Sequence, residues 1–350
     1  MTTTEIAPRR SPSTGATDWF PELICPACRG PLTFDGLSSS SCRSCPRDWP
    51  DVAGLPDLRL APDRYLSLAD ERTKAEALAE AASTPGADVS RVASAYYALT
   101  DDVVDQRRDR FLRHIAGAVA RGEALASRLP GAGLMLEIGC GTGGLLVAAA
   151  RSGRSIVGVD VASRWLVVAR RRLADHGLRL PLVAAGGDQL PWPDATFDAV
   201  AADSVLEHLD DPASALREWR RVLKPGGELV VWSPNRFTLT TDPHLGLWGV
   251  GWLPRAWVPS YLSRRGRTDW PPGVLSAFEA RRLARRSGWV GVSVEPPGVT
   301  ESWARTRSAS ERGLLFAYNV ARRLPMGRGI LRAVGPLWEL RAEAPRGEVA

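Results

Sequence analysis

A glycine-rich segment, residues 136–144 with the sequence LEIGCGTGG, most constrains what this chain can fold into. An apolar run of strand length, 134–138, leads into it, and a helix-length run, 143–151, leads out of it. Glycine lets the backbone turn sharply and approach a ligand closely. A strand, a glycine loop and a helix in this order are typical of the place where a parallel α/β sheet binds a nucleotide-like cofactor.

The glycine spacing by itself leaves the kind of adenosine cofactor open. Gly139, Gly141 and Gly144 satisfy the G-x-G-x-x-G pattern of dinucleotide-binding enzymes. Asp160 follows close to the position of the acidic residue in those enzymes. A nicotinamide dinucleotide and another adenosine-containing ligand are therefore both compatible with the loop alone.

Short apolar runs alternate with helix-length segments from residue 134 onward. The strand-like runs are 134–138, 155–160, 182–185, 197–202, 228–232, 289–295 and 337–341. The helix-length segments between them are 143–151, 163–176, 212–223 and 276–287. This alternation predicts an α/β fold, namely a Rossmann-like, doubly wound, mostly parallel sheet of seven strands with helices on both faces.

Composition and pattern divide the 350-residue chain into five parts. The apolar content of 44% and the charged content of 24% are close to globular averages, which excludes a wholly disordered protein. We expect a disordered tail, a small cysteine-rich domain, a helical linker or lid, the α/β domain, and a helical insertion followed by a closing edge strand. Their bounds are 1–20, 21–60, 61–130, 131–300 and 301–350, with a tryptophan-rich insertion at 236–275.

Four of the five cysteines form two Cys-x-x-Cys pairs near the N-terminus. They are Cys25 with Cys28, and Cys42 with Cys45. Two such pairs offer four thiolates in the tetrahedral arrangement that structural zinc prefers, and four protein ligands leave no position open for catalysis. Bound metal would supply the folding energy that so short a region cannot gain from an apolar core. The alternative is four unrelated buried cysteines.

Further motifs follow the glycine loop in a fixed order. Residues 156–160 end a strand on a carboxylate, 187–191 read GDQLP, 206–209 read LEHL and 223–229 read LKPGGEL. Together with Glu137, which opens the loop, they resemble the class I S-adenosylmethionine-dependent methyltransferases, especially the branch with the ubiquinone and menaquinone methyltransferases. The cysteine-rich region resembles the zinc ribbons fused to, or partnering, some RNA and protein methyltransferases. A dehydrogenase is disfavoured because dinucleotide loops usually lack the acidic residue.

The resemblance implies how S-adenosylmethionine is bound. Its methionine part lies against the loop, and its ammonium group is attracted by a carboxylate. Its ribose hydroxyls donate to a second carboxylate, and its adenine is held by a third and by an apolar side chain. The residues concerned are Gly139, Gly141, Gly143, Glu137, Asp160, Asp188 with its neighbour Gln189, and Val161. Cys140 is a small packing residue of the loop rather than a nucleophile, since no base stands beside it. The plainer alternatives are turn carboxylates at positions 160 and 188.

Methyl transfer from a sulfonium needs a general base only where the acceptor must lose a proton. Candidate bases after the fourth strand are Asp203, Glu207 and His208, and the imidazole titrates near neutral pH. His244 is a second choice, and both histidines could instead serve only local structure. The first three residues could also gather a divalent ion, as some quinone O-methyltransferases do near such a Glu-His pair.

The nature of the acceptor is the most open question. Trp248, Trp252, Trp257 and Trp270 could form a lid, stack on nucleobases, or sit at a membrane interface and take up a lipid-linked acceptor. Residues 313–324 are amphipathic and end in arginines, which suits peripheral membrane contact.

We expect a cytoplasmic methyltransferase that uses S-adenosylmethionine and structural zinc and acts on a small-molecule or lipid-linked acceptor. The formal charge of +6 also suits nucleic acid, so an RNA methyltransferase is the alternative. Against it, ADSV follows the fourth strand where base-methylating enzymes often carry N/D-P-P-Y/F. A non-catalytic scaffold would show a degraded cofactor loop, which this sequence does not. No apolar run reaches the ~20 residues of a transmembrane helix, and residues 1–15 lack a secretory apolar core.

Overall fold

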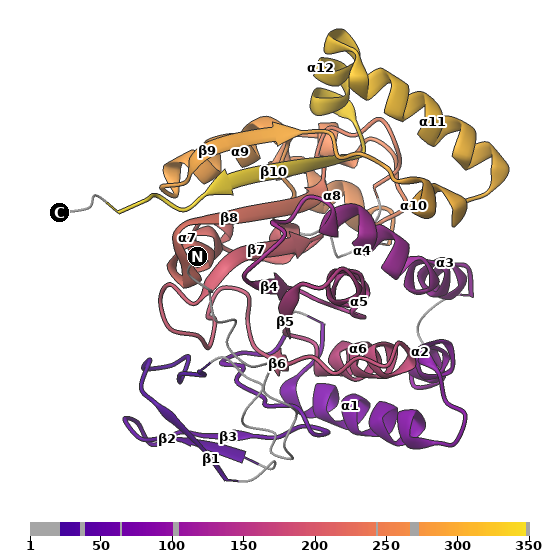
Figure 1. Ribbon diagram of the computed structural model, residues 1–350. Helices are drawn as coiled ribbons and strands as arrows, with labels where there is room; N and C mark the ends of the chain where they lie inside the picture. Colours follow the sequence, from indigo (N-terminus) through magenta and orange to yellow (C-terminus); the bar gives the residue numbers. More distant parts are fainter. Residues whose placement is uncertain are drawn as a thin grey trace, which may run out of the picture.

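The computed structural model describes residues 22–35, 39–63, 65–100, 105–242, 244–266 and 273–347. The expected tail at 1–20 and Trp270 lie outside the described residues. Within the described ranges the chain forms a large sheet covered by helices and a small sheet near the N-terminus (Figure 1).

The large sheet has seven strands in the order β6-β5-β4-β7-β8-β10-β9, and the first five of these pair in parallel. Their bounds are β4 Leu134–Ile138, β5 Ser155–Asp160, β6 Leu182–Ala184, β7 Phe197–Asp203, β8 Leu223–Pro234, β9 Val290–Glu295 and β10 Leu337–Glu343. The predicted doubly wound, mostly parallel sheet of seven strands is confirmed. The strands are apolar on both faces, as expected where helices cover both sides.

The sequence predicted that the last strand closes the sheet at its edge, and this prediction is wrong. β10 lies between β8 and β9 and pairs antiparallel with both, so β9 is the edge strand. Trp338, Leu340 and Glu339 of β10 are all buried, the carboxylate included, because helices cover both faces here. Glu339 accepts hydrogen bonds from Arg128 and from the Trp232 indole, which offsets the cost of burying its charge.

Helices pack on both faces of the sheet. α5 (Gly144–Arg151) and α6 (Ser163–Asp175) belong to one apolar core, and α7 (Pro212–Val222) and α9 (Ala277–Arg286) belong to the other. The described part of the region expected as a helical linker or lid forms four helices, and α1 packs on α6 while α4 packs on α5. Their bounds are α1 Leu68–Ser83, α2 Val89–Ala98, α3 Asp105–Ala116 and α4 Ala118–Ala126.

The tryptophan-rich insertion holds short helical turns, η3 (Val250–Trp252), η4 (Arg255–Trp257) and α8 (Val258–Ser263), around a small apolar cluster of its own. Trp248, Trp252 and Trp257 remain exposed rather than packing down on the sheet domain as a lid would. α10 (Glu301–Arg305), α11 (Ala309–Arg323) and α12 (Pro325–Val334) connect β9 to β10.

The N-terminal sheet consists of β1 (Leu32–Asp35), β2 (Ser39–Cys42) and β3 (Asp48–Pro50), all antiparallel. It lies beside β6 in Figure 1. Just after it, Asp57 forms a parallel bridge with Ala184 of β6, where the Leu58 N–H donates to the Ala184 carbonyl at 2.7 Å. The Ile24 N–H donates to the Pro191 carbonyl at 3.0 Å. The small domain is therefore hydrogen-bonded to the large sheet.

Candidate cofactor and acceptor site

A cavity of about 560 Å³ opens at the carboxyl ends of the parallel strands. The loops after β4, β5, β6 and β7 form its floor, while α3, α4, residues 60–63 and Tyr65 form its walls. Ligands of open α/β sheets bind at this edge, and the volume is in the range of small-molecule sites. Nearly all the cofactor residues predicted from the sequence line it; they are Glu137, Gly139, Cys140, Gly141, Asp160, Val161, Asp188 and Gln189.

The glycine loop has the left-handed backbone that its sequence allows. Gly139 has φ 67°, and a Cβ atom there would collide with the side chain of Val205. Gly143 has φ 77° but is not part of the cavity wall, because a Cβ there would point at Ala169 of α6, 3.1 Å away. The first glycine allows the loop after β7 to pack closely against the glycine loop, whereas the last one allows α5 to start against α6.

Asp160 ends β5 with its carboxylate held by the backbone. One oxygen accepts from the Gly141 N–H and the other from the Ala162 N–H, each at 2.8 Å. Burial raises the pKa of this carboxyl, and the two N–H groups act in the opposite direction. Each oxygen keeps a further lone pair, so the group can accept from two neighbouring hydroxyls.

Glu137 is buried in β4 with one unsatisfied oxygen. Its side chain lines the cavity, and among the described residues Oε2 has no hydrogen-bond partner. Burial raises the pKa of Glu137 well above its usual range, with Asp203 and Asp160 adding to the effect. A cationic ligand group in the cavity would satisfy that oxygen and favour the ionised form. The residues present therefore fit the ammonium and the ribose of S-adenosylmethionine.

Burial raises the pKa of Cys140 well above its usual value, and the nearby carboxylates of Asp160 and Glu137 reinforce it. A thiol that stays protonated is a poor nucleophile, which agrees with a packing role. On the adenine side, Asp188 and Gln189 are exposed at the rim, and the Val161 carbonyl accepts from Arg59 at 3.1 Å. Arg59 is itself paired with Asp57, so the small domain braces this wall.

His208 is one of two candidate bases that line the cavity. It lies on the short helix η2 (Leu206–His208), and its Nδ1 is 3.3 Å from the Tyr65 hydroxyl. Asp203 also lines the cavity, but both its oxygens accept from Arg121 at 2.6 Å. Burial opposes ionisation there, yet the Arg121 guanidinium holds the pKa of Asp203 below its usual value. A carboxylate held this way positions Arg121 rather than accepting a proton.

Glu207 and His244 lie behind His208 and outside the cavity wall. Glu207 is fully buried, accepts from the Ser233 hydroxyl at 2.9 Å, and has its pKa raised to about 8 by burial. His244 Nε2 is 3.8 Å from Glu207 Oε1, and neither atom has a hydrogen-bond partner within the described part of the chain. The His208 and His244 rings meet edge to face, 4.9 Å apart.

The ligand atoms of Glu207, His208 and His244 lie within 4.8 Å of one another and could hold a metal ion. The sequence suggested Asp203 as the third member of such a group. The structure brings in His244 instead, since Arg121 occupies the Asp203 carboxylate.

Several cavity residues were missed by the sequence reasoning. Tyr65, Phe111, His114 and Arg121 come from the segment before α1 and from α3 and α4. Burial, with help from Arg121, lowers the pKa of His114. The region was expected only to form a linker or lid, and no motif marks these residues. Ser204 has φ 59°, a left-handed backbone conformation that serine rarely adopts and that the sequence does not predict.

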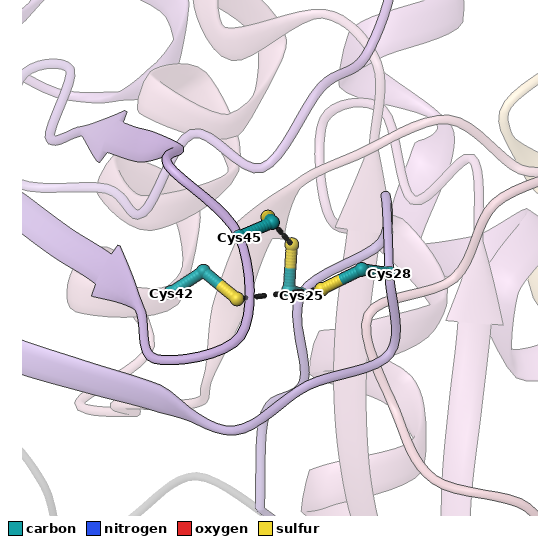
Figure 2. A group of neighbouring side chains, drawn as sticks. All are labelled: Cys25, Cys28, Cys42 and Cys45. Atoms are coloured by element: carbon teal, nitrogen blue, oxygen red, sulfur yellow. Dashed lines mark hydrogen bonds between the residues drawn. The ribbon is translucent and has the colours of Figure 1, made fainter.

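The four paired cysteines converge on one point (Figure 2). Cys25 and Cys45 have their sulfurs 3.8 Å apart, Cys28 and Cys42 have theirs 3.4 Å apart, and all four sulfurs lie within 4.8 Å of one another. Backbone N–H groups of Gly30 and Ser44 point at two of the sulfurs, which favours thiolates. Four converging thiolates can hold a zinc ion, as predicted.

The family profile described as "Methyltransferase domain" matches residues 136–231. A ubiquinone biosynthesis O-methyltransferase of Cereibacter sphaeroides is 33% identical over 221 residues, which are 61% of this chain and 83% of that protein. One from Caulobacter vibrioides is 34% identical over 189 residues, 52% of this chain and 70% of that protein.

A solved structure of Haemonchus contortus phosphoethanolamine N-methyltransferase 2 with S-adenosyl-L-methionine aligns with a TM-score of 0.43 and 19% identity. The alignment covers 64% of this chain and 52% of that chain, so this chain spans about half the length of that protein.

The chain belongs to the class I S-adenosylmethionine-dependent methyltransferases. Both the predicted class and the predicted cofactor are confirmed. In the ranges that the structure covers, we find no helix with the length and apolar character needed to cross a bilayer.

Proposed function

We propose that this enzyme methylates a hydroxyl group on a small or lipid-linked, largely apolar acceptor. The observation that carries the proposal is His208, an imidazole on the cavity wall with its Nδ1 next to the Tyr65 hydroxyl. Attack by a hydroxyl oxygen on a methyl sulfonium releases a proton, and an imidazole at this place can accept it. The two O-methyltransferases named above support the same chemistry.

The cofactor is held by the predicted residues in this proposal. Glu137 binds the ammonium, Asp160 accepts from the ribose hydroxyls, and the loop at Gly139 and Gly141 lies along the methionine part. Val161 packs on the adenine, and Asp188 accepts from its amino group. The sulfonium supplies an activated methyl group, so these residues act by fixing its direction and excluding water.

The acceptor lies on the opposite side of the cavity, between His208 and the helical wall. Phe111, Trp165 and Leu209 add apolar surface to the cavity lining. Arg121, whose guanidinium is fixed by Asp203, offers a cation to a phenolate or carboxylate of the acceptor. His208 takes the hydroxyl proton, and Tyr65 keeps its ring oriented as a positioning residue.

The reaction is placed in the cytoplasm in this proposal. Five cysteines without a disulfide among the described residues suit a reducing compartment. Cell fractionation with an antibody to the native chain tests the placement.

Labelled methyl transfer tests the proposed function. Full-length protein is incubated with methyl-labelled S-adenosylmethionine and with catechols that do or do not carry a prenyl chain. We expect an O-methyl ether in mass spectra, and we expect His208→Gln to lower kcat while the affinity for S-adenosylhomocysteine stays unchanged. The matched control is His176→Gln, because His176 lies at the C-terminal end of α6 and does not line the cavity. Label in RNA alone, or on nitrogen alone, would contradict the proposal.

A further inference from the structure

α11 and α12 form a helical hairpin that presents apolar side chains to solvent. In the described structure no residue of either helix is buried, although Leu314, Phe316, Leu324, Met326 and Ile330 belong to this hairpin. Phe316 is 72% exposed and Met326 is 80% exposed. Figure 1 shows both helices at one end of the molecule, beyond β9 and β10. Exposed apolar side chains gathered on two helices that contact each other are typical of an interaction site.

The orientation of α11 is the reverse of that of an ordinary surface helix. Phe316, Val320 and Leu324 follow at intervals of four residues and share the outer face. On the inner face the Tyr318 hydroxyl donates to the Pro297 carbonyl at 2.8 Å, and the Asn319 side chain bonds both backbone groups of Val299. Polar groups thus hold the helix to the protein, while its apolar face points away from the core.

Positive charge is concentrated in the same part of the chain. Between Glu301 and Val334 there are seven arginines and two glutamates, a formal net charge of +5 out of +6 for the whole chain. Arg312, Arg323 and Arg328 are exposed on the hairpin. An apolar protrusion flanked by cations is complementary to an anionic lipid bilayer, whose headgroups bind arginine and whose acyl chains receive apolar side chains. Nucleic acid would offer phosphates to the arginines but no apolar phase for the exposed apolar side chains.

We propose that the α11–α12 hairpin docks this enzyme on anionic membrane surfaces. Phe316, Leu324, Met326 and Ile330 enter the boundary between headgroups and acyl chains, and Arg312, Arg323 and Arg328 pair with lipid phosphates. The proposal stands on the hairpin alone and does not rest on the identity of the acceptor.

The hairpin is also connected to a residue of the cavity wall, Arg121. α10, directly before α11, carries Trp303, which stacks on Trp232 at 5.9 Å between ring centres. The Arg121 guanidinium lies 5.1 Å from the centre of the Trp303 ring and pairs with Asp203 in the cavity. The chain of contacts from α10 through Trp303 and Arg121 therefore connects the hairpin to the cavity wall.

Vesicle sedimentation with the full-length protein tests the docking surface. We expect binding to vesicles of phosphatidylcholine mixed with phosphatidylglycerol, little binding to phosphatidylcholine alone, and weakening by salt. Phe316→Ser with Met326→Ser, and separately Arg323→Glu with Arg328→Glu, should each reduce binding at least about tenfold. The control Phe34→Ser removes an exposed phenylalanine from the small domain, at the other end of the molecule, and should bind as the unaltered protein does.

Binding of S-adenosylhomocysteine, unchanged in all variants, shows that they are folded and separates this test from that of the enzymatic proposal. Vesicle binding that survives both hairpin variants overturns the docking site. So does failure to bind anionic vesicles, whether the hairpin instead captures RNA or pairs two copies of the chain.

Discussion

The Asp160 carboxylate gives the most direct test of the cofactor site. The change is Asp160→Asn, which keeps the size of the side chain but replaces one accepting oxygen with an amide NH₂. In the structure each oxygen already accepts one backbone N–H, from Gly141 or from Ala162. Only the remaining lone pairs serve the ribose, and the substitution removes those of one oxygen.

The expected loss is therefore one charge-assisted hydrogen bond to the cofactor. Such a bond contributes about 1.5–3 kcal/mol, which corresponds to roughly a 10- to 150-fold weaker affinity. Isothermal titration of the purified protein with S-adenosylhomocysteine measures this directly. Thermal unfolding without ligand is recorded alongside, because the loop also loses an acceptor for one of its N–H groups.

Asp198 provides a matched control. It also accepts a backbone N–H, from Leu134 at 2.8 Å, and it pairs with Lys224, but it lies at the amino end of the strands, away from the cavity. Asp198→Asn should lower stability and leave cofactor affinity unchanged. Unaltered affinity in Asp160→Asn, or an equal loss in both variants, would refute the assignment of Asp160.

Three further predictions follow from neighbouring features. Burial keeps the pKa of Glu137 high, so binding of the cationic cofactor should release a proton, which calorimetry in buffers of different ionisation enthalpy detects. In Glu137→Gln the proton release should vanish and the affinity for the cofactor should fall at least about tenfold. Proton release that persists in this variant would contradict the role of Glu137. Cys25→Ala should reduce bound zinc from about one ion per chain to none and lower the melting temperature, with Cys140→Ala as the control that retains zinc under metal analysis. Arg59→Ala should lower the free energy of unfolding, measured in urea, by about 3–5 kcal/mol because it leaves the buried Asp57 carboxylate unpaired. The double variant Asp57→Leu with Arg59→Met should recover most of that loss. Equal instability of the single and the double variant would count against the buried pair.

The parts of the site that sequence could predict are those carried by local motifs. The glycines of the loop, Glu137 and Asp160 lie at strand ends whose order in the sequence fixes their place at one edge of the sheet. The four cysteines were predictable for a similar reason, since each Cys-x-x-Cys pair already places two sulfurs together and a single contact between the two pairs completes the site. In both cases the spacing along the chain already determines most of the geometry.

The remaining parts depend on contacts between distant segments. Arg121 meets Asp203 across 82 positions, and Arg59 meets the Val161 carbonyl across 102, with no motif to announce either. The place of β10 inside the sheet depends on how α10–α12 return the chain between β8 and β9, which a strand-length apolar run cannot indicate. The outward apolar face of α11 was visible as amphipathicity, but its direction is set by Tyr318 and Asn319.

The parallel bridge between Asp57 and Ala184 has a consequence for solubility. β6 and β9 are the two edge strands of the sheet, and an uncovered edge strand offers unpaired N–H and C=O groups to other chains. The backbone of residues 56–58 pairs with the N–H and the C=O of Ala184 at the end of β6, and this backbone belongs to the cysteine-rich domain. A metal ion bound by the four cysteines would thus help to prevent aggregation through the edge of β6, a role that is separate from methyl transfer.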